Sequence, residues 1–418
     1  LRNTATERTT LMGILEQVLG ELRIRKPQRA FLLVLVRLRF VIPGRINYAN
    51  LARFSGKSEK TFRTWFGKPF NFMAVTSCLV NLAQEAGHLS KALALVIDSS
   101  HIRKSGKQSP GLGKYWESKA GKAMSGLEVS CCAVVDLAGH FALPLDALQT
   151  PSLLAAGESR VDHYRHHLNN VLGELPVQLL SNMNYVVADA YYTKKDFVDA
   201  VVKAEKHFIG KLRCDANLKY LYERKSTGKP GRPRLYAGKV DFKDFSKWQL
   251  VSQEQTDKQT VTTYTAIVFA VGLKRKIRVV CVLITLKGKT TRHLFFSTDI
   301  DLAATTILAF YQARFQIEFC FRDAKQFTGL LDSQSRQPQA IHFHWNMALL
   351  VVTLTRLEQL SLHPTSHDSF VFSMEDAKRR AYNEFFAEKI FRFLPFGETF
   401  SNFKHRLDSL LNLGVKAA

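Results

Sequence analysis

The chain has few cysteines, no long apolar run and many fewer acidic than basic residues. Its six cysteines lack Cys-x2-Cys spacing, so we expect buried small hydrophobes in a reducing cytoplasm rather than zinc ligands or disulfides. The most apolar stretch, Phe31 to Ile42, is short and contains Arg37 and Arg39. A helix that spans a bilayer needs roughly 20 apolar residues, so no membrane partner is expected. We also expect no signal peptide at the start.

The shortage of acids leaves a strongly positive chain. There are 59 Lys and Arg residues against 36 Asp and Glu residues, a formal net charge of +23. Such an excess predicts a polyanionic partner. A length of 418 residues with 46% hydrophobic residues predicts a folded globular protein of more than one unit.

The most informative stretch is residues 311–325, YQARFQIEFCFRDAK. In one continuous helix of about 100° per residue, Tyr311, Arg314, Glu318 and Lys325 would form a single narrow stripe. An adjacent apolar face would fasten the helix to a core, and it consists of Phe310, Ile317 and Phe321. An amphipathic helix with i,i+4 charge pairing explains Arg314 with Glu318, but not the whole stripe. A carboxylate between two cations and a phenol suits a site where metal and phosphate meet.

Two aspartates follow short apolar runs. Leu93–Ile97 ends in Asp98, and Tyr185–Ala188 ends in Asp189. Such runs are typical of buried strands covered on both faces, so we expect both carboxylates at the rim of a sheet. Each aspartate alone fits a turn or a helix cap equally well. The prediction of a site therefore depends on their convergence with Glu318.

These residues resemble those of a known family. The chain is similar to DDE transposases of bacterial insertion sequences, in the subgroup with a Tyr-x2-Arg-x3-Glu-x6-Lys signature, which residues 311–325 match without a gap. Asp98 in VIDSSH and Asp189 in VVADAYYT match the first two acids of the family. The resemblance covers about residues 90–360, and it implies cutting of DNA and joining of the freed 3′ ends to a target. It further implies release of flanking DNA through a hairpin.

Three converging carboxylates would repel one another unless divalent cations occupied the site. All-oxygen ligands favour hard ions, so we expect two Mg²⁺ or Mn²⁺ ions held by Asp98, Asp189 and Glu318. Arg314 and Lys325 are expected to hold phosphates of the transferred strand, and Tyr311 to hydrogen-bond a nearby phosphate. No small-molecule cofactor is expected.

Residues 1–90 are expected to form a helical, helix-turn-helix-like DNA-binding domain. Tyr48–Phe54 predicts one short helix, Gly56 a turn, and Ser58 the N-cap of a second helix to about Phe66. On the second helix Lys60 and Arg63 point outward and are candidate DNA contacts. A plain three-helix bundle gives the same periodicity.

The remaining chain predicts an α/β fold with a ribonuclease-H-like mixed five-stranded sheet and helices. The expected core covers 91–213 and 293–360, interrupted by a β-rich insertion at 214–292. A helical C-terminal region, 361–418, is a possible dimerisation element. The expected core strands are 93–98, 129–136, 141–148, 185–189 and 207–212. His163, His166 and His167 cluster on a predicted helix, and with no Glu between them and no nearby Cys we expect them at the surface rather than on zinc.

Basic residues group in two segments beside the predicted acids. The first, from 101 to 122, contains Arg103, Lys104 and Lys107, and the second, from 219 to 247, contains Arg232 and Arg234 in a Gly-Arg-Pro-Arg sequence. Solvated loops would have the same composition. Phosphate contact is favoured because both segments flank the acids.

The sequence thus predicts a cytoplasmic, nucleoid-associated enzyme acting on double-stranded DNA, both the terminal repeats of an element and target DNA, as a homodimer. A catalytically silent DNA-binding descendant of a transposase and a structure-selective nuclease on the same core remain alternatives.

Overall fold

The computed structural model describes residues 11–117, 120–222, 234–362 and 372–393, together with residues 407 and 411. The described chain begins with helices α1 (Leu11–Glu21), α2 (Lys26–Val41), α3 (Tyr48–Ser55), α4 (Glu59–Phe66) and α5 (Phe72–Glu85). Local chemistry sets their ends. The side chains of Asn47 and Ser58 cap α3 and α4, and Gly56 ends α3 at a φ of 69°, where a residue with a Cβ would be strained. The two short helices and the turn expected here are confirmed.

The middle of the molecule is a mixed sheet. Its strands are β1 (Leu93–Arg103), β2 (Gly113–Glu117), β3 (Lys122–Asp136), β4 (Phe141–Gln149), β5 (Tyr185–Val187) and β6 (His207–Leu212). β3 is antiparallel to both β1 and β4, whereas β1, β5 and β6 run parallel, so these five strands lie in the order β4-β3-β1-β5-β6. A mixed α/β fold is confirmed.

The first strand is longer than predicted. β1 continues past Asp98 to Arg103 because β3 pairs with it along its whole length, and Asp98 lies opposite Cys131. Asp98 is therefore inside a strand, not just beyond its end. It does mark the point where parallel pairing with β5 has stopped, since the last pair is Val96 with Val187.

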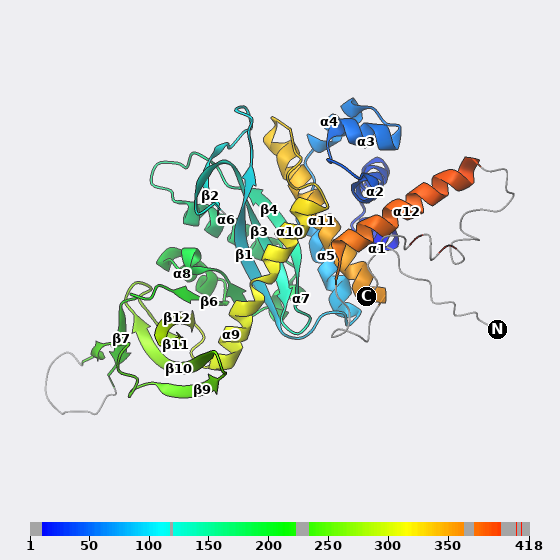
Figure 1. Ribbon diagram of the computed structural model, residues 1–418. Coiled ribbons are helices and arrows are strands. Elements are labelled where there is room, and N and C mark those ends of the chain that lie inside the picture. Colours follow the sequence, from blue (N-terminus) through cyan, green and yellow to red (C-terminus); the bar gives the residue numbers. More distant parts are fainter. Residues whose placement is uncertain are drawn as a thin grey trace.

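A second group of strands extends the same sheet. These are β7 (Leu218–Leu221), β8 (Tyr236–Lys239), β9 (Gln249–Gln255), β10 (Gln259–Ala270), β11 (Arg275–Leu286) and β12 (Lys289–Ser297). β12 pairs with β11 on one side and with β6 on the other, so the β-rich lobe is continuous with the central sheet. Figure 1 shows this lobe in green, below β6 and beside α9. The β-rich segment expected at 214–292 contains most of these strands, and β10 and β11 are the longest of them.

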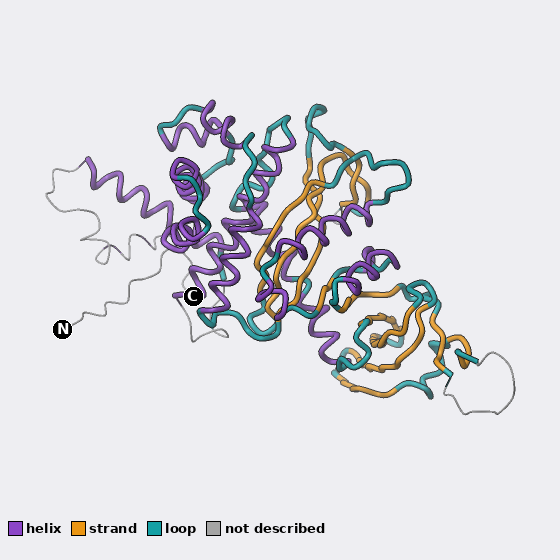
Figure 2. The backbone as a smooth tube through the Cα atoms, turned by 180° about the vertical axis from the view of Figure 1, so that it is seen from behind, coloured by secondary structure: helices purple, strands orange, loops and turns teal. Residues whose placement is uncertain are grey.

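Helices cover both faces of the central sheet (Figure 2). The covering elements are α6 (Arg160–Glu174), α7 (Val177–Asn182), the 3-10 helix η1 (Ala190–Tyr192), α8 (Lys195–Lys203), α9 (Ala304–Ala313) and α10 (Gln316–Gln326). Alternating residues of β1 separate two apolar cores: Leu95 joins the core under α6 and α8, whereas Val96 joins the core under α9 and α10. Asp98 has the same parity as Val96, so it faces α10.

Two long helices complete the described fold. α11 (Pro338–Leu362) is buried along most of its length between β4 and the N-terminal helices, and α12 (Met374–Phe393) lies across α2. Figure 1 shows α11 running through the middle of the molecule. A search of the described helices finds none that combines the length and apolarity required to cross a bilayer. All six cysteines are free, and four are buried: Cys131, Cys132, Cys281 and Cys320.

Candidate active site

Asp98 and Asp189 come from neighbouring parallel strands. Val96 of β1 is in register with Val187 of β5, and each aspartate follows two residues later. Adjacent strands lie about 4.8 Å apart, so the two carboxylates leave the sheet at nearly the same level. Asp189 caps η1, because its Oδ1 accepts a hydrogen bond of 2.8 Å from the backbone N–H of Tyr191.

The segment 311–325 is not the single helix that the sequence predicts. α9 ends at Ala313 and α10 begins at Gln316. Between them the backbone N–H of Phe315 bonds to the carbonyl of Gln312 at 3.1 Å, a bond to a residue three positions earlier that tightens the turn. Tyr311 and Glu318 therefore belong to different helices, and Arg314 lies at the junction.

Arg314 joins two of the three acids. Its Nη1 donates to Asp98 Oδ2 at 2.9 Å and its Nη2 donates to Glu318 Oε1 at 3.0 Å. The side chains of Arg314 and Asp98 are only 13% and 15% exposed, so this ion pair is shielded from solvent, whereas Glu318 is 42% exposed. The break between α9 and α10 thus directs one guanidinium toward both carboxylates.

The electrostatics of Asp98 reflect this crowding. Burial raises the pKa of Asp98 to about 7, Arg314 opposes that rise, and the carboxylates of Asp189 and Glu318 add to it. The pKa of Asp98 therefore depends on the charges of both other acids. The structure places Asp98 and Glu318 on Arg314, and it brings Asp189 near enough to Asp98 to affect its pKa.

The two remaining signature residues make contacts within the protein. The ring of Tyr311 packs on Phe295, with centroids 4.7 Å apart, and burial raises the pKa of Tyr311. Lys325 Nζ donates to Ser100 Oγ at 2.8 Å and to the carbonyl of His101 at 2.9 Å. Lys325 therefore fastens α10 to β1 close to Asp98.

The donor set is made of carboxylate oxygens, which favour hard divalent cations. Among the residues that the structure describes, no group of three or more His, Cys, Asp or Glu side chains is spaced to hold a metal ion. The guanidinium of Arg314 lies between Asp98 and Glu318 and pairs with both. The chemistry of the acids fits a cation, and a cationic side chain of the protein already lies between two of them.

The phosphate contacts predicted between residues 101 and 122 include exposed side chains and one side chain that is bonded within the protein. Arg103 and Lys107 are exposed. Lys104 instead donates from Nζ to the carbonyls of Leu331, at 3.2 Å, and Ser333, and burial lowers its pKa. Its ammonium group is used to hold the segment before α11, which the sequence could not indicate.

The other predicted contacts are distributed over two distant parts of the molecule. Lys60 and Arg63 are exposed on α4, as expected, and Arg63 also pairs with Glu59 at 3.1 Å. Arg234 Nε donates to the carbonyl of Tyr236 at 2.8 Å. Arg232 lies outside the described residues.

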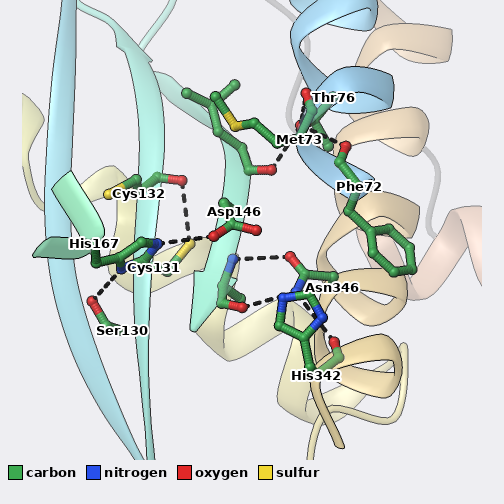
Figure 3. Close-up of polar contacts among 12 residues, drawn as sticks. Phe72, Met73, Thr76, Ser130, Cys131, Cys132, Asp146, His167, His342 and Asn346 are labelled. Atoms are coloured by element: carbon green, nitrogen blue, oxygen red, sulfur yellow. Dashed lines mark hydrogen bonds and ion pairs between the residues drawn. The ribbon is translucent and has the colours of Figure 1, made fainter. Parts of the chain in front are cut away.

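A polar cluster on the opposite face of the sheet was missed. Figure 3 shows His167 of α6 between Ser130 of β3 and Asp146 of β4; its Nδ1 is 2.8 Å from Ser130 Oγ and its Nε2 is 3.1 Å from Asp146 Oδ2. The expected surface position of His167 is wrong, because the side chain is 1% exposed. Val161, Tyr164, Leu168 and Val171 share its helix face, and this apolar spacing was the available signal.

Comparison with known proteins defines the class. The family described as "Transposase DDE domain" matches residues 89–354, the part of the chain that carries all three acids. The chain is therefore of the DNA transposase class. It belongs to the family of transposase DDE domains. Members of this family generally use divalent metal ions.

More distant comparisons add little. No curated protein matches the chain. A piggyBac transposase synaptic complex with hairpin DNA, solved by cryo-electron microscopy, aligns over 96% of this chain and 82% of that chain, with a TM-score of 0.41 and 11% sequence identity.

Proposed function

We propose that this chain is an active transposase of a bacterial insertion sequence, which binds the element's terminal inverted repeats, excises the element and joins its 3′ ends to target DNA. The observation that carries this proposal is the contact of the Arg314 guanidinium with Asp98 and Glu318, beside Asp189, which follows the neighbouring strand β5. The three acids are far apart in sequence: Asp98 lies in β1, Asp189 follows β5 and Glu318 lies in α10. Such convergence of charged groups, with a raised pKa for Asp98, is typical of a functional site.

We assign the central strands to a ribonuclease-H-like core. The order β4-β3-β1-β5-β6 supports this, with an antiparallel hairpin at one end and parallel strands at the other. We further propose that 214–292 is an insertion in this core, that 1–90 binds DNA, and that 361–418 helps to form a homodimer. The protein would act in the bacterial cytoplasm, at the nucleoid.

Asp98, Asp189 and Glu318 would hold the cations, two Mg²⁺ or Mn²⁺ ions in our proposal. When bound, such ions activate a water or a 3′-hydroxyl and stabilise the leaving oxygen of a phosphodiester. Arg314, which bonds both Asp98 and Glu318, would exchange a carboxylate for a phosphate of the transferred strand when DNA binds. Lys325 keeps α10, and with it Glu318, in a fixed position against β1.

The proposal is tested with the DNA that flanks the native gene, incubated with protein and Mg²⁺. We expect nicked ends with free 3′-hydroxyls, hairpinned flanking DNA and joined products in a plasmid target. Asp98→Asn, Asp189→Asn and Glu318→Gln should each lower the cleavage rate more than about 100-fold, beyond the usual cost of losing an outer-shell residue. The matched control is Asp215→Asn, an exposed acid on the β-rich side of the molecule, which should cleave normally.

The two alternative functions give different products. If neither the wild type nor Asp98→Asn cleaved the correct terminal repeats, the result would favour a catalytically silent DNA-binding protein. Cleavage that needs no terminal repeat and yields no joined product would favour a structure-selective nuclease.

A further inference from the structure

A cavity of about 650 Å³ lies away from the three acids, between the helix pair α3–α4 and residues 334–337. We call it the α3–α4 pocket. Its volume is in the range of small-ligand sites, which span about 300 to 1,000 Å³. In Figure 1 the blue helices α3 and α4 lie beside the end of α11 where this segment enters. The lining residues used below are Tyr48, Glu59, Arg63, Gln334, Arg336 and Gln337.

One wall of the pocket is the guanidinium of Arg63, which lies over the ring of Tyr48. The Arg63 guanidinium carbon lies 4.7 Å from the centre of the Tyr48 ring, and its Nη2 is 3.1 Å from Glu59 Oε2. Tyr48 in turn packs edge-on against the buried Phe66, with centroids 5.3 Å apart. Arg63 therefore has a supported inner face, and a planar ring can stack on its outer face.

The opposite wall offers polar groups without partners. The side-chain amides of Gln334 and Gln337 make no hydrogen bond to any residue that the structure describes, and neither does the exposed guanidinium of Arg336. Amides complement the donor and acceptor edges of bases, and an unpaired arginine complements a phosphate. The ligand that these two walls fit has a flat ring, a polar edge and a negative charge.

Hydrogen bonds connect the pocket to the sheet that carries Asp98. The backbone N–H of Ile46, next to α3, donates to Asp332 Oδ2 at 2.8 Å, and Lys104 at the end of β1 donates to the carbonyl of Leu331 at 3.2 Å. Both contacts hold the segment that leads into 334–337. A DNA strand bound in the pocket would therefore keep a fixed position relative to Asp98, which lies in β1 shortly before Lys104.

We propose that the α3–α4 pocket binds one nucleotide of single-stranded DNA, with its base stacked on Arg63, its base edge on Gln334 and Gln337, and its phosphate on Arg336. This inference rests on the proposed function only in taking DNA as the ligand. Double-stranded DNA does not fit, because pairing occupies the base edge that Gln334 and Gln337 would bind, and neighbouring pairs cover both faces of a base in the interior of a duplex.

The test uses a short single-stranded oligonucleotide carrying 2-aminopurine, and the same sequence as a blunt duplex, both in EDTA so that no cleavage occurs. We expect Arg63→Lys, which keeps the charge and loses the plane, to weaken single-strand binding about tenfold and to abolish the change in 2-aminopurine fluorescence that occurs when the base leaves its stacked neighbours and binds in the pocket. Arg336→Ala and the pair Gln334→Ala with Gln337→Ala should also weaken single-strand binding. Duplex binding should change less than about twofold in the Arg336 and glutamine variants.

Arg53→Lys is the matched control, because Arg53 lies exposed on α3 outside the pocket. Equal effects of Arg53→Lys and Arg63→Lys would overturn the proposal, and so would loss of duplex and single-strand binding in parallel. Unchanged binding in the Arg336 and glutamine variants would also overturn it, and these exposed substitutions leave the fold intact. Since the assay contains no metal, its result is separate from the cleavage test of the proposed function.

Discussion

Arg314 is the residue on which the charge balance of the candidate site depends. Asp98 lies in a buried position next to two further carboxylates, and a group in that environment would keep its proton without a nearby cation. The guanidinium provides that cation and hydrogen-bonds two of the acids at once. We infer that Arg314 stabilises the acids before metal and DNA arrive and then exchanges a carboxylate for a phosphate.

A first prediction concerns Arg314→Gln in the absence of DNA. In the wild-type protein, Mn²⁺ binding requires Arg314 to leave at least one carboxylate, and a charge-assisted hydrogen bond contributes about 1.5–3 kcal/mol. The variant has no such bond to break. We expect its dissociation constant for Mn²⁺, measured from the electron paramagnetic resonance signal of free Mn²⁺, to be at least about tenfold lower than that of the wild type, while its DNA cleavage rate falls.

The control for this prediction is Arg322→Gln on the same helix. Arg322 is 51% exposed and pairs with Asp323 rather than with the three acids. Its Mn²⁺ affinity should equal that of the wild type. Weaker Mn²⁺ binding by Arg314→Gln would show that Arg314 favours metal binding rather than competing with the metal for the carboxylates.

At the scale of secondary structure, periodicity predicted most elements but not their interruptions. The apolar runs at 93–97 and 185–188 predicted buried strands of a sheet, and the structure shows that these strands, β1 and β5, are paired. The break at residues 314–315 was not predictable, because it contains neither Gly nor Pro and both residues keep αR backbone angles. The sequence also could not predict which of the candidate phosphate-binding cations form hydrogen bonds within the protein. Lys104, for example, donates to carbonyls more than 200 positions away in the chain.

The fixed position of α6 on the sheet leads to a second prediction, for His167→Gln. Burial alone lowers the pKa of His167, but Cys132 and Asp146 outweigh it and raise the pKa to about 10, so the buried ring is charged beside Asp146. Removing one partner of a buried ion pair costs about 3–5 kcal/mol. We expect a loss of that size in the free energy of unfolding at about pH 6, measured by urea denaturation.

The pH dependence of this loss has a definite sign. The folded pKa of about 10 exceeds the ordinary value of 6.5, so the stabilisation is complete below about pH 6.5 and is lost as the pH rises toward 10. The difference between wild type and His167→Gln should therefore shrink with rising pH. His166→Gln, on the exposed face of the same helix, should change stability by less than about 0.5 kcal/mol at any pH. A difference that does not vary with pH would mean that His167 is neutral in the fold.

At the scale of the whole molecule, the net charge of +23 predicts DNA binding that depends steeply on salt. Net charge does not identify the side chains that contact phosphate. The structure distinguishes them, even among residues that are close together in the sequence. Arg103 and Lys107 are exposed at the end of β1 and just beyond it, whereas Lys104 between them is turned inward. The three residues therefore form an internal comparison in one short segment.

The third prediction uses this comparison. Each phosphate contact contributes about 0.9 to the slope of log affinity against log salt concentration on duplex DNA. Replacing Arg103 and Lys107 together by Gln should lower that slope by about 1.8 and leave the melting temperature unchanged. Lys104→Gln should leave the slope unchanged and lower the melting temperature, because it frees the carbonyls of Leu331 and Ser333. If Lys104→Gln lowered the slope as much as one of the exposed cations, its ammonium group would have to leave these carbonyls when DNA binds. The segment before α11 would then move with it, so the DNA-bound protein would differ from the structure at the point where the N-terminal helices join the catalytic sheet.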